Sequence, residues 1–246
     1  MIDALRALGQ LLMVAMRALR ATPRLSTREL WRAAARFGQR ALPVALAVSA
    51  VTGGVIVLET ATYTVAFGAR DILGGLAGIG ILREFAPLMV ALVMSGWVGA
   101  RNAAELGNLT LGGQITALRG LGANPDEVLL APRLWGALAA MLLLALPTDL
   151  AALGGGAVAA KVVLGVGPGM FFRSFMHWVK LRDVLEGLLK VGAFALAIAL
   201  VSARAGLHTR GGAQDVGRGV AMSVVHSVLA VLLLDVTLTV LVGGRL

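Results

Sequence analysis

The chain has 246 residues, of which 58% are hydrophobic and 14% charged, with 32 glycines and no cysteine. A soluble domain carries roughly a quarter charged residues, so this composition argues against a soluble globular protein and favours a polytopic membrane protein. The lack of cysteine excludes disulfides and thiolate sites, and the lack of a GxxxxGK[ST] loop excludes ATP binding of the P-loop kind. We expect no metal site, because the three histidines are scattered and no carboxylates are paired at the spacing of metal ligands.

The net charge of +9 would suggest nucleic-acid binding in a soluble protein. Here it is better explained by arginines at a membrane surface, because eight of the 22 basic residues precede residue 41. We therefore expect no nucleic-acid partner.

Residues 1–41 have the pattern of interfacial amphipathic helices. Residues 1–21 place leucines on one helical face and arginines on the opposite face. After Pro23, the stretch 26–29 (STRE) offers a capping box for a second helix. Four arginines then recur at every fourth position, which favours attraction to anionic headgroups over a merely solvated stripe: Arg28, Arg32, Arg36 and Arg40.

The rest of the chain, 42–246, is predicted to be one membrane domain. A bilayer core of about 30 Å needs roughly 20 apolar residues per helix. Five stretches qualify: Leu42–Phe67, Leu82–Ala100, Leu134–Val158, Val184–Ala205 and Val220–Val242. Residues 72–81 are too short and too rich in glycine to span, and we expect them to re-enter the membrane or to lie at its surface.

The distribution of basic residues predicts the orientation. With the N-terminus in the cytoplasm, 14 basic residues lie on the cytoplasmic side and seven outside. The positive-inside rule therefore supports a cytoplasmic N-terminus, a periplasmic C-terminus and an odd number of spans.

Among the ionisable residues within the predicted spans we single out five, and the helical rise places all five in the outer half of the membrane: Glu59, Arg83, Glu84, Lys190 and Asp235. Asp149, near the outer end of the third span, is expected to snorkel to water. A charge in hydrocarbon is costly, so each requires a partner or a polar cavity. Two interpretations remain open, an ion-pair network that holds helices together and a polar wall on a cavity open to the outside.

The stretch 82–133, LREFAPLMVALVMSGWVGARNAAELGNLTLGGQITALRGLGANPDEVLLAPR, resembles the permease subunits of MCE-associated ABC transporters, the MlaE family. The matching positions are Arg83-Glu84, Pro87, Gly96, Gly99, Ala104-Glu105, Gly107, Gln114, Ala117-Leu118, Gly122, Pro125 and Pro132-Arg133. Residues 171–190 and 223–244 are similar to the outer segment, fourth span and last span of proteobacterial members. Trp97, Leu109 and Gly113 depart from the family pattern, and Gly113 stands where a Glu is usual.

The resemblance implies an all-α polytopic fold with N-terminal interfacial helices, about five transmembrane helices and a cytoplasmic coupling helix. It implies a homodimer in the bacterial inner membrane, bound to two copies of a separate ABC ATPase that binds ATP and Mg²⁺. This chain would then need no cofactor and no catalytic residue of its own. The further partners implied are an MCE-domain protein on the periplasmic side and often a small STAS-domain protein. The implied substrate is a phospholipid moved between the inner membrane and the outer envelope, in support of outer-membrane lipid asymmetry.

The resemblance also implies two sets of site residues. A coupling helix at about 105–122 would dock on the ATPase, through Glu105, Leu109, Gln114, Leu118 and Arg119. In that helix Leu106, Ile115 and Leu121 would also pack. A central lipid cavity would be lined by Ile56, Glu59, Tyr63, Thr64, Phe67, Arg83, Glu84, Lys190 and Asp235. Ile56, Tyr63 and Phe67 also share one helical face by their spacing alone. For the lipid phosphate, Arg83 is the first candidate and Lys190 the second.

Two other classes of function are considered. The first is a membrane enzyme. Ser95-Gly96 followed by His226 faintly resembles an intramembrane serine protease, but the nucleophile motif is incomplete. A lipid-headgroup transferase would need clustered aspartates, which the sequence lacks. An ion or proton channel would rest on the buried charges alone and leaves the loop 101–133 unexplained.

Overall fold

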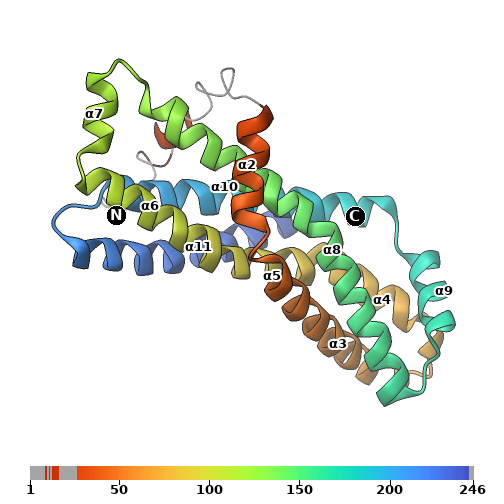
Figure 1. The fold of residues 1–246 in the computed structure, drawn as a ribbon. Coiled ribbons are helices and arrows are strands. Elements are labelled where there is room, and N and C mark those ends of the chain that lie inside the picture. The colour runs from red at the N-terminus through yellow and green to blue at the C-terminus, as the bar shows by residue number, and fades with distance from the viewer. Residues whose placement is uncertain (1–8, 10, 12, 17–26, 244–246) are drawn as a thin grey trace. The chain divides into compact units, whose positions relative to one another are not determined.

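A computed structural model describes residues 9, 11, 13–16 and 27–243, and within them the chain forms helices and no strand. Most of the predicted first amphipathic helix and Ser26 of the predicted capping box lie outside the described residues. Figure 1 shows the helices in chain order. They are α2 (Thr27–Gly38), α3 (Leu42–Ala66), α4 (Leu73–Gly80), α5 (Ala86–Met94), α6 (Ala100–Leu111), α7 (Gln114–Gly120), α8 (Ala131–Leu164), α9 (Pro168–Trp178), α10 (Leu181–Leu207) and α11 (Ala213–Gly243).

Five helical stretches of the described chain are long and apolar enough to cross a membrane, which confirms the prediction of an all-α polytopic protein with five spans. They are Leu42–Ala66, Arg70–Leu111, Asp126–Leu164, Leu181–Leu207 and Ala213–Leu241. Each contains one of the five predicted apolar stretches, or all of it but its last residue. Three of them extend well beyond it, and the fourth, Leu181–Leu207, extends a few residues beyond it. A helix can continue past the hydrocarbon because its backbone is satisfied internally at any depth.

The second stretch corrects the prediction for residues 72–81. These residues are neither re-entrant nor a separate surface segment, because α4 continues through a π-helical turn, Ile81–Phe85, directly into α5. Its glycines serve close packing, since Gly74, Gly75 and Gly78 are buried. The adjacent charges Arg83 and Glu84 made this point look like the start of a span, whereas they lie in the middle of a helical stretch of 42 residues.

Contacts divide the described chain into two compact units. Unit 1 comprises the described residues up to Gln39 together with Met94–Met141 and Ala193–Leu234. Unit 2 comprises Arg40–Val93, Leu142–Gly192 and the described residues from Asp235 onward. The helices α8, α10 and α11 each contribute one segment to each unit.

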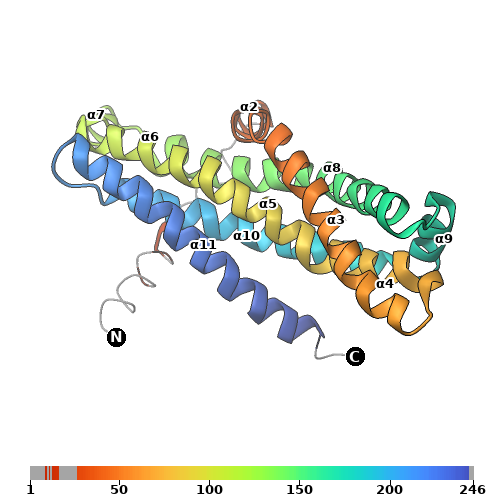
Figure 2. The same cartoon turned by 90° about the horizontal axis from the view of Figure 1, so that it is seen from below.

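In unit 2, small residues let helices approach closely, as is common between membrane helices. A side chain at Gly53 of α3 would meet the backbone of Ala152 in α8, and α4 lies along α9 in the same way (Figure 2). The amide of Gly75 in α4 donates a hydrogen bond of 3.1 Å to Ser174 Oγ of α9. The core around these contacts is apolar and includes the fully buried side chains of Leu73 and Phe171.

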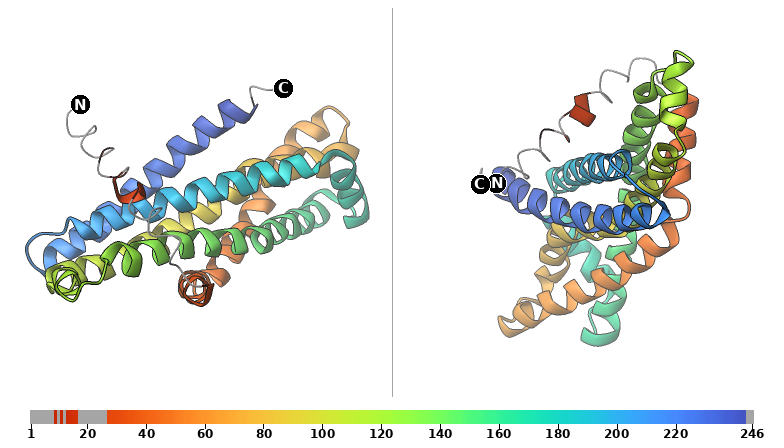
Figure 3. Two further views of the ribbon diagram at one scale, coloured as in Figure 1. Left: turned by 90° about the horizontal axis from the view of Figure 1, so that it is seen from above. Right: turned by 90° about the vertical axis from the view of Figure 1, so that its left-hand side faces the viewer.

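In unit 1, α6 packs against the adjoining parts of α10 and α11 through buried polar contacts. Asn102 Nδ2 of α6 donates a hydrogen bond of 2.8 Å to Ser202 Oγ of α10, and both residues are fully buried. Ser223 Oγ of α11 donates to the carbonyl of Gly99 at 3.3 Å. The α6–α7 turn and the α10–α11 connection lie at the same end of this unit (Figure 3).

Candidate functional site

Lys190 of α10 is the centre of a buried charge network in unit 2. Its side chain is only 5% exposed, and its ammonium group is bound by the carboxylates of Glu84 and Asp235. The distance from Lys190 Nζ to Asp235 Oδ1 is 2.9 Å, and to Thr239 Oγ1 it is 2.7 Å. One buried cation on α10 is thus held by a carboxylate of the second stretch and by a carboxylate and a hydroxyl of α11, so the cluster joins three helical stretches.

Arg83 belongs to a second network, which corrects the prediction that it shares one cluster with Glu84, Lys190 and Asp235. Its guanidinium lies 2.7 Å from Glu186 Oε2 and 3.8 Å from Asp183 Oδ1, both on α10. Arg182 also binds Glu186, at 2.7 Å. The first candidate for a lipid phosphate is therefore already committed to two carboxylates of this chain.

The two adjacent residues Arg83 and Glu84 reach different turns of α10 because the backbones come close here. A side chain at Gly187 would lie 2.2 Å from the carbonyl oxygen of Leu82, so only glycine permits this approach. The π-helical turn that contains Arg83 and Glu84 widens the helix at this point. The contact brings Asp183 and Glu186 to one side of Leu82 and Lys190 to the other.

Sequence reasoning missed Asp183, Glu186 and Thr239 as members of these networks. The signal was present, because 183, 186 and 190 recur at three- and four-residue steps on one face of α10. Thr239 follows Asp235 by one helical turn and donates to its backbone carbonyl at 2.8 Å.

The predicted lipid-facing side of α3 is only partly exposed. Tyr63 and Phe67 are 67% and 84% exposed, and Glu59 lies exposed near them. No described side chain forms an ion pair with Glu59. Thr64 is buried, and Ile56 packs against the core of unit 2. Of the residues predicted to line the cavity on this helix, Glu59, Tyr63 and Phe67 are thus exposed, whereas Thr64 and Ile56 pack inside unit 2.

The predicted coupling helix 105–122 is not one helix. The long second stretch ends with α6 at Leu111, and α7 begins at Gln114 after a break at Gly112 and Gly113. Gly113 has φ +68°, a left-handed conformation that costs other residues about 1–2 kcal/mol. Figure 1 shows α7 turned away from the direction of α6.

The residues proposed for coupling differ in exposure. Gln114 and Arg119 on α7 are exposed, whereas Leu109 and Leu118 are half-buried. Leu121, expected to pack, is 83% exposed and so does not pack within the described chain. Arginine is enriched at protein–protein interfaces, so the exposed Arg119 suits a surface that binds another protein.

Glu105 lies in unit 1 among arginines of the same chain. Its carboxylate lies 2.8 Å from Arg101 Nε, 3.2 Å from Arg133 Nη2 and 4.0 Å from Arg36 Nη1. These contacts join α6 to α2 and α8. Glu105 is therefore part of the internal support of the α6–α7 corner, whatever else it contacts.

The fold and the buried charges define a multi-pass membrane protein of five spans. A sequence profile of the family described as Permease MlaE matches residues 30–241, which include all five apolar stretches but the last residue of the fifth. The chain belongs to this family.

Curated relatives agree with this assignment. The chain is 32% identical over 197 residues to a probable ABC transporter permease protein of Synechocystis, covering 79% of this chain and 74% of the relative. It is 27% identical over 209 residues to the intermembrane phospholipid transport system permease protein MlaE of Haemophilus influenzae, covering 85% and 80%. It is 27% identical over 204 residues to the chloroplastic protein TRIGALACTOSYLDIACYLGLYCEROL 1 of Arabidopsis thaliana, covering 83% and 58%. This chain is accordingly a permease subunit rather than the ATPase itself, and its family implies an ATPase partner.

Proposed function

We propose that this chain is the permease of an ABC transporter that moves glycerophospholipids between the bacterial inner membrane and the outer envelope, and so supports outer-membrane lipid asymmetry. The observation that carries the proposal is the family match over residues 30–241. It is supported by the Haemophilus relative, whose name specifies intermembrane phospholipid transport. ATP and Mg²⁺ would be bound by the partner ATPase.

The exposed side of α3 supports a lipid substrate. Val51, Val55, Tyr63 and Phe67 are exposed large apolar side chains on this helix, and Glu59 lies among them. Apolar side chains of this kind suit acyl chains, and a second copy of the chain would enclose the space that they face. Tyr63, Phe67 and Glu59 are the residues that we propose to contact lipid.

In this proposal Lys190, Glu84 and Asp235 hold the cavity walls rather than bind the lipid phosphate. Lys190 already has two carboxylate partners, and Arg83 has two others. A phosphate would have to compete with carboxylates that lie at hydrogen-bond distance. The networks connect the second span to α10 and α11, so we assign them a structural role.

We propose that α7 and the exposed Leu121 form the contact with the ATPase. Arg119 supplies an exposed charge on this segment, and Gly113 sets its direction. The complex would contain two copies of this chain and two ATPases, an MCE-domain protein on the periplasmic side and a STAS-domain protein on the ATPase. The excess of basic residues on one side supports a cytoplasmic N-terminus and a periplasmic C-terminus.

The alternative functions receive less support from the described residues. Ser95 is fully buried while His226 is exposed, so they do not form an accessible catalytic pair. The charges that suggested a channel are largely paired within the chain, as described for Lys190 and Arg83.

The test is purification of the full chain from a bacterial membrane, followed by protein and lipid mass spectrometry. We expect an ABC ATPase and phospholipid to co-purify with the wild type. We expect Tyr63→Asp/Phe67→Asp to lower the phospholipid content while the ATPase is retained. The matched control is Met176→Asp, an exposed apolar residue on α9. Purification of a lipid-free chain without an ATPase would contradict the proposal.

A further inference from the structure

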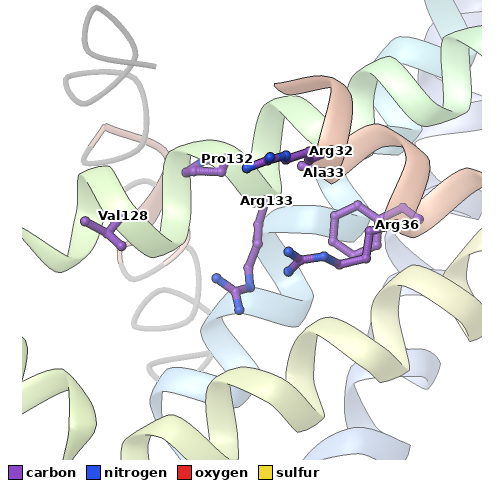
Figure 4. A pocket seen from close by; sticks show the side chains of 7 residues that line it. Arg32, Ala33, Arg36, Val128, Pro132 and Arg133 are labelled. Atoms are coloured by element: carbon purple, nitrogen blue, oxygen red, sulfur yellow. The ribbon is translucent and has the colours of Figure 1, made fainter. Parts of the chain in front are cut away.

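A pocket in unit 1 is lined by three arginines and lies outside the proposed lipid path. It has a volume of about 210 Å³ and lies between α2 and the start of the third span. Its basic residues are Arg32 and Arg36 from α2 and Arg133 from α8. Figure 4 shows Arg36 of α2 extending toward the side chain of Arg133 of α8.

The pocket has an excess of positive charge. Glu105 is the carboxylate that pairs with Arg36 and Arg133, and it is shared with Arg101. The described residues that line the pocket include three arginines and no carboxylate, and Arg32, Arg36, Arg101 and Arg133 together with Glu105 have a summed formal charge of +3. Arginine guanidinium groups bind phosphate through paired N–H donors, so an anion with several oxygens suits the site.

The side chain of Arg133, which lines the pocket, has a hydrogen-bond donor that no described group accepts. Its side chain is only 11% exposed, and its Nε–H is buried without a hydrogen-bond partner in the described part of the chain. A buried unpaired N–H costs free energy comparable to a lost hydrogen bond. An anion that accepts this N–H would remove that cost.

The other half of the pocket is apolar. Ala33, Phe37, Val128 and Pro132 complete its lining. A volume of about 210 Å³ lies below the roughly 300–1,000 Å³ of pockets that enclose whole small molecules, so only part of a larger ligand fits. Three cations beside an apolar wall match a phosphate attached to glycerol better than a free, fully hydrated anion.

The position in the chain places this pocket at the edge of the membrane. Arg133 directly precedes the apolar stretch that begins at Leu134, and α2 ends four residues before the stretch that begins at Leu42. Trp31 on α2 is 62% exposed, and tryptophan is enriched at membrane–water interfaces. A lipid headgroup is therefore available where the pocket opens.

We propose that the pocket between α2 and α8 binds the phosphate of an anionic phospholipid headgroup. The acyl chains remain in the bilayer, and the headgroup joins α2 to the start of the third span. This site is separate from the path of the transported lipid, so it stands or fails independently of the proposed function.

The test measures binding of dioleoylphosphatidylglycerol to the full chain in detergent by native mass spectrometry. The pocket variant is Arg32→Gln/Arg36→Gln, and the control is Arg28→Gln/Arg40→Gln, which removes the same charge from the same stripe outside the pocket. We expect the pocket variant to raise the dissociation constant about tenfold or more, because hydrogen bonds to charged groups are lost. We expect the control to stay within about twofold, as for exposed charges.

Three further measurements identify the ligand and the site at which it binds. Val128→Trp enlarges a residue that lines the pocket without changing its charge, and we expect it to weaken binding as the arginine variant does. Dioleoylphosphatidylcholine, which carries no net charge, is expected to bind weakly and equally to all variants. Inorganic phosphate is expected not to displace the lipid at millimolar concentration. Equal losses in the pocket variant and the control would overturn the proposal, and so would displacement by inorganic phosphate.

Discussion

Two ion-pair clusters among the described residues, those around Lys190 and Glu105, have opposite compositions. In unit 2, one lysine with a side chain only 5% exposed is bound by two carboxylates. In unit 1, one carboxylate with a side chain 31% exposed is bound by three arginines. The first cluster is nearly neutral once the adjacent Arg83 pairs are included, as hydrocarbon requires. The second keeps a positive excess, which a membrane surface tolerates and an anionic leaflet attracts.

This difference separates two tasks. The unit 2 networks join spans through buried charges, and in the proposed function the exposed face of α3 is left for lipid. The unit 1 cluster supports the corner from which α7 projects, and its arginines are left with capacity for an anion. The predictions below test this separation, beginning with the largest expected effect.

Replacing α7 (Gln114–Gly120) by a Gly-Ser linker of seven residues is expected to abolish transport. The ATPase contact would be lost, while unit 2 would keep its lipid face. The measurement is ATP-dependent lipid transfer from reconstituted vesicles, with phospholipid content of the purified chain as the second readout. We expect Arg119→Glu to have the same direction of effect, with Arg173→Glu, an exposed charge on α9, as control. Normal transfer by the linker variant would show that α7 is not the coupling element.

Lys190→Met is expected to destabilise the chain by about 3–5 kcal/mol, because it leaves two carboxylates without their cation. Thermal unfolding in detergent is the measurement. The triple variant Lys190→Met/Glu84→Gln/Asp235→Asn is expected to recover most of this loss, since no uncompensated charge remains. A loss below about 1 kcal/mol for the single variant would show that this cluster behaves like an exposed one.

Glu105→Gln is expected to cost a smaller amount, about 1–2 kcal/mol, because the carboxylate is partly solvated. The matched control is Asp215→Asn, an exposed carboxylate 3.6 Å from Arg218 in the same unit. The free energy of unfolding is again the measurement. An equal effect of both variants would remove the distinction between the Glu105 cluster and a surface ion pair.

Arg182→Gln is expected to cost the least, about 0.3–0.5 kcal/mol, as for other i,i+4 pairs at a surface. Arg182 and Arg83 bind the same residue, Glu186, but their side chains are 54% and 23% exposed. Arg83→Gln is therefore expected to cost more than Arg182→Gln in the same assay. The reverse order would mean that burial does not determine the strength of these pairs.

Much of the fold is readable from the sequence because the bilayer imposes a length on apolar stretches. The five spans, the basic N-terminal segment and the motif between residues 82 and 133 identify the class and the family without coordinates. The glycine pair 112–113 carried a signal for the break before α7, which the helical interpretation of 105–122 overlooked. By contrast, nothing local to Arg83 and Glu84 indicates that one pairs with Glu186 and the other with Lys190.

The sequence by itself thus determined that charges lie within the spans, which residue types they are, and that the chain is a membrane permease. Only the tertiary structure decided which of them pair, because pairing depends on which helical turns face each other across the Gly187–Leu82 contact. The same contact explains why 72–81 joins the second span. Arg83 and Glu84 interrupt the hydropathy of that stretch, but carboxylates and a lysine of α10 neutralise them, so the helix continues through a point that hydropathy marks as an end.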